Sequence, residues 1–175
     1  AATKEGARRD RLALIRAAAV AAGDRKDGFV PQRPGSGFED RAVGGTANPT
    51  SVDIQVDLEG DDDGDIVATV TLRRAFEGAP GRAHGGIVAA SFDDVTGYVI
   101  GRLGEPAFTG ELTVRFLAPV PVEAPLVIRT RLQGRERRKL FITAEMLADG
   151  VVIATCKAIY ITVDPSIFAG APDPR

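Results

Sequence analysis

The chain has 175 residues, of which 44% are hydrophobic and 26% charged, a composition typical of a soluble globular protein with one ordinary domain. Its 22 basic and 24 acidic side chains leave a formal net charge of −2, which excludes a global attraction to nucleic acid or to an anionic membrane surface. One cysteine excludes an intrachain disulfide framework, and with one histidine it excludes the usual zinc clusters of three or four such ligands. No apolar run approaches the roughly 20 residues of a membrane span. We therefore expect a soluble protein of a reducing, cytoplasmic compartment, with no metal or other cofactor.

The first fifty residues differ in character from the rest. Residues 8–22 (RRDRLALIRAAAVAA) carry apolar side chains at helical spacing, and Gly23 follows as a stop. Basic residues before an Ala-rich run also occur in signal peptides, but Arg16 interrupts the apolar run, which favours a helical arm. Residues 23–49 are rich in Gly, Pro, Asp and Arg without a sustained period, as in a loop. We assign residues 1–50 to a helical arm and a Gly/Pro-rich linker.

A period of two begins after this linker. Residues 52–58 alternate apolar and polar side chains, which predicts a half-buried strand. Residues 60–65 (GDDDGD) predict a turn and residues 66–76 a second strand, so the two strands form a hairpin. The acidic turn resembles a calcium loop, but aligning it to that loop puts Val70 where the bidentate glutamate must stand. Calcium binding at this turn is therefore excluded.

One helix and four further strands complete the expected domain. The helix covers residues 87–103, and the strand-like stretches are 108–117, 126–134, 140–148 and 151–163. Asp149-Gly150 is typical of a type I′ turn between the last two strands. This order predicts an α+β fold in which an antiparallel sheet wraps around one central helix. We expect the domain to cover residues 51–165, with residues 166–175 as a tail.

The expected helix has two contrasting faces. The apolar stripe for the sheet comprises Ile87, Ser91, Val95, Tyr98 and Val99. The other face comprises Gly86, Ala89, Ala90, Asp93 and Gly97, in which only Asp93 is not very small. Small residues let a neighbouring backbone or a ligand come close, and a buried carboxylate among them needs partners or a chemical role. The alternative is a solvated stripe formed by Asp93 and Asp94.

A specific pattern surrounds the start of this helix. His84-Gly85-Gly86 is followed by small and apolar residues, with Asp93 nine residues after the histidine and then Gly97. The flanking segments of the same pattern are residues 76–81 (FEGAPG), 112–119 (LTVRFLAP) and 149–154 (DGVVIA). Together they resemble hotdog-fold acyl-CoA thioesterases of the phenylacetate-pathway (PaaI-like) type, with their HGG…D signature. The resemblance runs from about Ser51 to Asp164. It implies the hotdog fold, hydrolysis of an acyl-CoA thioester, and a homodimer or a dimer of dimers.

The resemblance also implies a role for each matching residue. The Gly85 N–H would polarise the thioester carbonyl, with Gly86 beside it in the substrate site, because a helix N-terminus offers unpaired N–H groups and a positive dipole. Asp93 would act as general base or nucleophile. His84 would position the loop or the thioester, or would cap the helix as a purely structural residue. Thr109 matches a Ser/Thr that helps to orient water in some members, or is an ordinary strand threonine. In the family, the glycine turn and the acid come from different subunits.

Three positions qualify this assignment. Many members carry an Asn in the loop where this chain has Gly78, so one polar contact is absent or replaced. Asp94 competes for the acid role, but both the family spacing and the small-residue face favour Asp93. Cys156 is expected to be a buried small residue, because no further histidine is available to activate it.

A coenzyme A substrate needs cations for its phosphates. The dense basic run of the matched region supplies Arg137, Arg138 and Lys139 in the turn between two expected strands. Family members often place basic residues near this point, at the mouth of the substrate tunnel. A solvated hairpin turn is the equal alternative, so these residues are candidate substrate-binding positions.

Two other functions fit the same fold. A hotdog hydratase or dehydratase would want a histidine and an acid placed for proton shuttling, whereas the single histidine lies in HGG rather than in a hydratase-type motif. A non-catalytic acyl-CoA sensor would need no Asp93 and could dock a partner through its basic N-terminal helix. No helix-turn-helix pattern supports DNA binding. Hydrolysis of an acyl-CoA is the favoured prediction.

Overall fold

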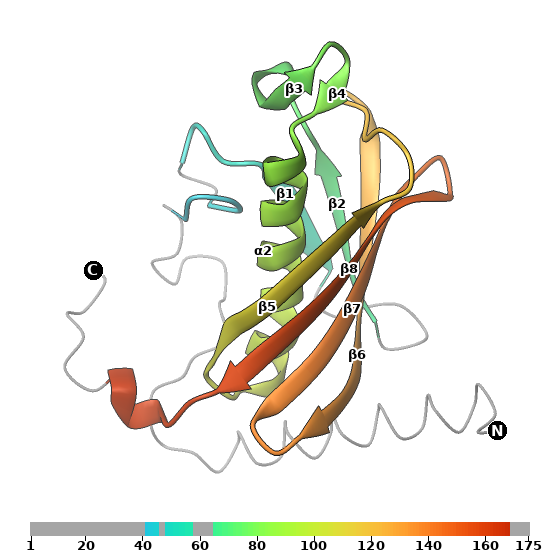
Figure 1. Ribbon diagram of the computed structural model, residues 1–175. Coiled ribbons are helices and arrows are strands. Elements are labelled where there is room, and N and C mark those ends of the chain that lie inside the picture. Colours follow the sequence, from blue (N-terminus) through green and yellow to red (C-terminus); the bar gives the residue numbers. More distant parts are fainter. Residues whose placement is uncertain (1–40, 46–47, 58–64, 169–175) are drawn as a thin grey trace, which may run out of the picture.

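The computed structural model describes residues 41–45, 48–57 and 65–168 (Figure 1). The expected N-terminal helical arm lies outside this part of the chain. The strands are β1 (Asp53–Asp57), β2 (Ile66–Thr71), β3 (Glu77–Ala79), β4 (Arg82–Ala83), β5 (Ala107–Phe116), β6 (Pro125–Glu136), β7 (Lys139–Ala148) and β8 (Val151–Thr162). The helices are α2 (Gly85–Leu103) and two short 3-10 turns, Arg74–Phe76 and Pro165–Phe168. No helix in the described ranges is long and apolar enough to cross a membrane.

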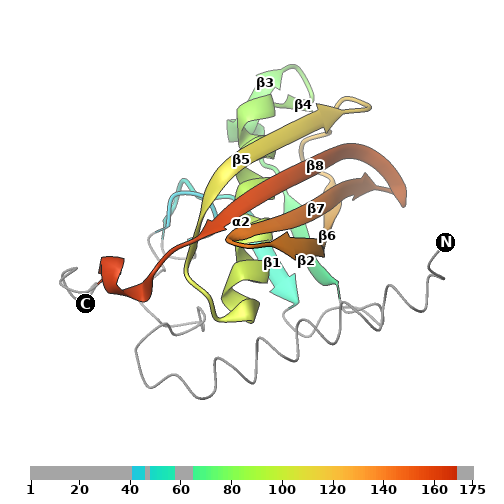
Figure 2. The ribbon, with the colours of Figure 1, turned by 60° about the horizontal axis from the view of Figure 1, so that its bottom comes forward.

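Six strands form one antiparallel sheet in the order β1-β2-β6-β7-β8-β5. The sheet curves around α2, which lies along its concave side (Figures 1 and 2). The chain runs from β2 through α2 to β5 at the far edge, and then fills the centre with β6, β7 and β8. This arrangement confirms the expected α+β fold with one central helix.

The core forms between α2 and the inner face of the sheet. Alternate side chains of the central strands are buried there, among them Leu126 and Ile128 of β6 and Ile142 and Met146 of β7. The buried residues of α2 are Val88, Ser91, Phe92, Val95, Thr96, Val99, Ile100 and Leu103. The expected stripe is therefore partly wrong, because Ile87 and Tyr98 are only partly buried while Val88 and Phe92 are completely covered. A sheet that wraps around a helix covers a broader arc than a flat one, and here that arc is centred on Phe92.

The helix α2 has defined ends. His84 is its N-cap, and Gly104 ends it in the left-handed conformation at φ 68°, where glycine avoids the strain of a side chain. The Gly104 N–H donates to the carbonyl oxygens of Ile100 and Gly101, both at 3.2 Å. The helix therefore begins two residues earlier than the apolar pattern predicts, at the glycines of the HGG motif.

The second strand is shorter than predicted. It ends at Thr71 rather than Phe76, because the chain turns into the 3-10 helix at Arg74 and then into the small β3–β4 sheet. The side chain of Glu123 accepts the Arg74 backbone N–H at 2.7 Å, which fixes this departure from the main sheet. The predicted turn at Asp149-Gly150 is confirmed, since both residues have positive φ, 49° and 78°.

A bulge interrupts β5 at Gly110. Thr109 pairs with Tyr160 of β8, and Glu111 pairs with the adjacent Ile159, so Gly110 has no partner of its own. Directly opposed residues point to the same side of a sheet, and Tyr160 is buried on the inner face. The bulge therefore turns Thr109 toward α2, although simple alternation from Glu111 would turn it outward.

Candidate active site

His84 organises the start of α2. Its side-chain Nδ1 accepts a hydrogen bond from the Gly86 N–H at 3.0 Å, and the backbone N–H of His84 donates to the Phe76 carbonyl at 2.7 Å. The expectation of two unpaired glycine N–H groups is thus wrong for Gly86, because the imidazole already caps it. Within the described residues the Gly85 N–H has no hydrogen-bond partner. One exposed donor, at the positive end of the helix dipole, is left for a ligand.

Gly78 explains how the preceding loop fits against this turn. A Cβ atom built on Gly78 would lie 2.9 Å from His84 Cα and 3.2 Å from its Cδ2. The strand β3 therefore packs directly against the histidine, and a larger residue would displace the backbone that precedes Gly85. The family's asparagine is replaced here by close backbone packing.

An open cavity of about 410 Å³ lies beside Gly85. Its lining comes from β4 and from the segment that ends β5, and includes Arg82, Phe116, Leu117 and Pro119. A Cβ atom on Gly85 would stand 3.4 Å from Phe116 Cζ, an ordinary van der Waals contact, so the glycine lies directly beside the aromatic ring. Phe116 and Leu117 are 50% and 52% exposed, so the cavity presents apolar surface next to the Gly85 N–H.

Asp93 lies midway along α2, on the face of small residues, and is half-buried. Thr109 of β5 donates from Oγ1 to Asp93 Oδ1 at 2.9 Å, so the structure brings together these two expected site residues. The hydroxyl of Tyr160 lies 3.4 Å from the same oxygen. No described residue donates a hydrogen bond to Asp93 Oδ2.

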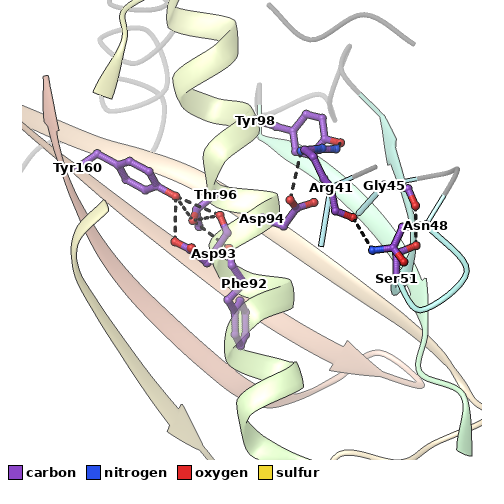
Figure 3. A network of polar contacts seen from close by, with 10 residues as sticks. All are labelled: Arg41, Gly45, Asn48, Ser51, Phe92, Asp93, Asp94, Thr96, Tyr98 and Tyr160. Atoms are coloured by element: carbon purple, nitrogen blue, oxygen red, sulfur yellow. Dashed lines mark hydrogen bonds and ion pairs between the residues drawn. The ribbon is translucent and has the colours of Figure 1, made fainter. Parts of the chain in front are cut away.

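Tyr160 belongs to the site although the sequence argument did not select it. It is 4% exposed, and its hydroxyl lies 3.0 Å from the Asp93 carbonyl oxygen and 2.9 Å from Thr96 Oγ1 (Figure 3). Burial raises the pKa of Tyr160 to about 12, so the phenol stays protonated and can donate. The sequence could have indicated Tyr160 through the alternation of side chains along β8, which places it on the helix-facing side with the small residues Cys156 and Ala158. A tyrosine in that position needs a polar partner.

Asp94 lies on another side of α2 from Asp93 and pairs with Arg41. Arg41 donates from Nη1 to Asp94 Oδ1 at 3.2 Å and from Nη2 to the Tyr98 hydroxyl at 2.6 Å (Figure 3). Burial raises the pKa of Asp94, although the positive charge of Arg41 opposes that rise. Gly44 packs so closely that a Cβ atom there would overlap Asp94 Oδ2. Asp94 thus anchors residues 41–45 to the helix, and the geometry favours Asp93 for chemistry.

The basic turn lies at the other end of α2 from His84. Arg138 donates from Nε to the Thr162 carbonyl at 3.0 Å, which gives this arginine a structural contact at the end of β8. The neighbouring Arg135 pairs with Glu105, just after α2, at 2.6 Å. Arg137 and Lys139 make no side-chain hydrogen bond or ion pair with the described part of the chain. Within one chain, therefore, the turn does not join the cavity at Gly85.

The two halves of the expected site are too far apart in one chain to act together. Gly85 and Asp93 are eight residues apart on one helix, or about 12 Å at 1.5 Å per residue. A thioester carbon must lie within about 3 Å of both the attacking group and the region of the N–H donor. Cys156 is confirmed as buried, which raises its pKa to about 12, and no group of three or more His, Cys, Asp or Glu in the described residues could hold a metal ion.

Comparison with known proteins identifies the family. Residues 80–154 match the thioesterase superfamily. A putative thioesterase, described as a phenylacetic acid degradation-related protein, from Ralstonia eutropha JMP134 is 30% identical, with a TM-score of 0.54 over 64% of this chain and 84% of that one. The chain belongs to the thioesterase superfamily. A hypothetical thioesterase protein from Streptococcus pneumoniae TIGR4, solved with coenzyme A, shares the fold, with a TM-score of 0.58 and 17% identity over 63% of this chain and 89% of that one. The fold is the hotdog fold, as the HGG…D resemblance implies.

Curated relatives are longer proteins. Acyl-coenzyme A thioesterase THEM4 of Mus musculus is 32% identical over 92 residues, which are 51% of this chain and 40% of that protein. The chain therefore spans about two fifths of the length of the curated relatives it matches.

Proposed function

We propose that this chain hydrolyses an acyl-CoA thioester to a free acid and coenzyme A, with residues 51–165 as the catalytic domain. The observation that carries the proposal is the Asp93 carboxylate on the small-residue face of α2, which is bonded through Oδ1 to Thr109 and accepts no hydrogen bond at Oδ2 from the described residues. The names of the curated relatives, and the coenzyme A in the streptococcal neighbour, support the same substrate class. A cytoplasmic location agrees with a single cysteine that is buried and unpaired.

We propose further that each active site needs two copies of the chain. The edge strand β5 supports this, because it exposes ten residues of backbone on one side together with Phe108 and Phe116, both 50% exposed. Two copies that pair along β5 about a two-fold axis run their α2 helices in opposite directions. The Gly85 end of one helix then approaches Asp93 of the other, which removes the separation of about 12 Å within one chain.

In the proposed reaction, the Gly85 N–H donates to the thioester carbonyl oxygen and stabilises the negative charge that develops there. Asp93 Oδ2 takes a proton from a water molecule, whose oxygen bonds to the carbonyl carbon. The carbon–sulfur bond then breaks, and the proton held by Asp93 passes to the departing thiolate, which leaves as coenzyme A. Alternatively, Oδ2 bonds to the carbonyl carbon, the carbon–sulfur bond breaks and the thiolate leaves. Water then hydrolyses the resulting anhydride, which restores the Asp93 carboxylate, releases the free acid and supplies the proton of the thiol. Thr109 keeps Asp93 oriented in both routes.

The alternative functions have less support in the geometry. A hydratase would use the histidine as a proton shuttle, but His84 Nδ1 is occupied by the Gly86 N–H. A non-catalytic sensor would need no hydroxyl groups around a half-buried carboxylate. We therefore propose neither function, and the sensor is an outcome of the following experiment.

The test is thiol release from a panel of short, long and aromatic acyl-CoA substrates. Asp93→Asn keeps the size of the side chain but removes the charge, so kcat should fall by about 10²–10⁴-fold with little change in KM. Asp94→Asn is the matched control on the adjacent residue, and it should stay within about tenfold of the parent. Equal turnover by parent and Asp93→Asn would refute the mechanism. Binding of acyl-CoA without turnover by the parent would favour the sensor.

Mixing two inactive variants tests the shared site. Gly85→Pro removes the N–H at a helix position that proline tolerates, and Asp93→Asn removes the charge. When equal amounts of the two variants are unfolded and refolded together, half of the dimers contain one copy of each variant. In such a mixed dimer one of the two sites has both Gly85 and Asp93 intact, so the preparation should recover about one quarter of parental activity. No recovery in mixed dimers, or a strictly monomeric mass by light scattering at micromolar concentration, would contradict the two-copy site.

A further inference from the structure

We infer that Tyr160 is a positioning residue for Asp93, whose hydroxyl helps to hold Oδ1 so that Oδ2 is the oxygen presented to the substrate. The inference rests on the proposed function and deepens it, because it assigns different tasks to the two oxygens of one carboxylate. Tyr160 itself does not need to touch the substrate in this arrangement.

The geometry around Asp93 is asymmetric. Thr109 and Tyr160 are direct partners on neighbouring strands, and both hydroxyls reach Asp93 Oδ1, at 2.9 and 3.4 Å. They approach from β5 and β8, so the carboxylate is held by two strands of the sheet as well as by its own helix. Two hydroxyl groups at one oxygen restrict rotation of the carboxylate, and the described residues leave Oδ2 unbonded.

The single hydrogen of the Tyr160 hydroxyl has three acceptors within reach. They are Asp93 Oδ1 at 3.4 Å, the Asp93 carbonyl oxygen at 3.0 Å and Thr96 Oγ1 at 2.9 Å. Thr96 can direct its own hydrogen to the Phe92 carbonyl at 2.9 Å, as helical threonines commonly do. An ionised carboxylate attracts the Tyr160 hydrogen more strongly than a neutral acceptor does. When Asp93 gains a proton, the hydrogen can turn to the Asp93 carbonyl oxygen and stay bonded.

The surroundings keep this hydroxyl in its donating form. Tyr160 is 4% exposed, and burial raises its pKa to about 12, so it stays protonated over the range in which a carboxylate titrates. Among the titratable groups of the described chain, the charge of Asp93 acts on Tyr160 and Cys156 of β8 and on Asp94 beside it on α2, the last paired with Arg41. Only the Tyr160 hydroxyl among them lies within hydrogen-bond reach of the Asp93 carboxylate.

The first test is Tyr160→Phe, which removes one oxygen and keeps the ring. Loss of this donor lets the carboxylate rotate more freely, so the effect should fall on the chemical step rather than on substrate binding. We expect kcat to fall by about tenfold and KM to change by less than about twofold. The ¹³C signal of the Asp93 carboxyl carbon, measured at one pH without any substrate, should also move, because the chemical shift of a carboxylate carbon responds to the hydrogen bonds it accepts.

The chain offers a matched control and a change of opposite sign. Tyr98→Phe removes the only other tyrosine hydroxyl, on the side of α2 that holds Arg41, and should leave the Asp93 carboxyl ¹³C signal and kcat unchanged. In that Tyr98→Phe background, growth on 3-fluorotyrosine labels Tyr160 alone. Fluorination makes the phenol a stronger donor, so the Asp93 carboxyl ¹³C signal should move in the direction opposite to that in Tyr160→Phe.

The outcomes separate the two proposals. An unchanged Asp93 carboxyl ¹³C signal in folded Tyr160→Phe, or in the fluorinated protein should the Phe variant not fold, overturns the positioning role of Tyr160. Opposite movements of this signal in the two proteins, in a chain that hydrolyses no acyl-CoA, would support the positioning role and refute the proposed function. Normal hydrolysis with an unchanged ¹³C signal in both would support the proposed function and refute the positioning role.

Discussion

His84 allows a structural role and a chemical role to be separated by one residue change. Its side chain is exposed and makes one hydrogen bond, from the Gly86 N–H at 3.0 Å. The backbone bonds of His84 to Phe76, Ile87 and Val88 do not depend on the imidazole. His84→Ala therefore removes only a helix cap, and an exposed cap is worth about 0.5–1 kcal/mol because water can replace it. For a chain of this size that corresponds to a decrease in Tm of about 1–4 °C.

His84→Asn completes the experiment. Asparagine is among the best N-cap residues, so it should restore the free energy of unfolding to within a few tenths of a kcal/mol of the parent. If His84 serves as a cap, kcat of His84→Asn should also stay within about threefold of the parent. Thermal melts by circular dichroism and thiol release measure the two quantities in one preparation. Parental stability with a loss of kcat beyond about 100-fold would refute the reasoning and assign the imidazole to the substrate.

Three further changes test other parts of the structure. Burial raises the pKa of Asp94 above its unfolded value of 3.8, so its contribution to stability falls as the pH rises through that interval. Asp94→Asn should therefore gain stability relative to the parent as the pH rises from 3.8 upward in urea melts, and a constant difference would contradict this. Replacing both Arg137 and Lys139 by Ala should raise KM more than it lowers kcat if they bind coenzyme A phosphates, whereas an unchanged KM at physiological salt assigns them to a solvated turn. Asp65→Asn should lower the free energy of unfolding by about 1–3 kcal/mol without affecting kcat, because it disrupts the hydrogen bonds from Arg131 to both oxygens of a buried carboxylate. Equal urea midpoints for the variant and the parent would contradict this.

Local patterns were sufficient to predict most of the fold. The period of two locates β5 to β8 to within about two residues, and Asp149-Gly150 predicts the last turn because only a few residue types tolerate two positive φ values. The end of β2 was missed for a non-local reason. The contact between Glu123 and the Arg74 backbone joins segments 49 residues apart, and no periodicity carries that information.

The site was predictable only in part. The helix places Asp93 among small residues, and the family spacing selects Thr109, so both could be named from the sequence. Tyr160 required the register between β5 and β8, which depends on the bulge. Arg41 required knowledge of how a segment without periodicity docks on α2. The capping of Gly86 required the rotamer of one imidazole. Each of these features is set by tertiary packing rather than by local preference.

The bulge at Gly110 divides β5 into two segments, and the alternation of inward and outward side chains is shifted by one residue between them. On one side of it the helix-facing position is odd-numbered, at Thr109, and on the other side it is even-numbered, at Leu112 and Val114. Deleting Gly110 would keep the strand's composition but exchange the inward and outward side chains of one segment, which would remove Thr109 from Asp93. The extra residue at Gly110 thus sets which side chains of β5 face the helix. A hybrid that transfers this strand to another hotdog protein must transfer the extra residue with it.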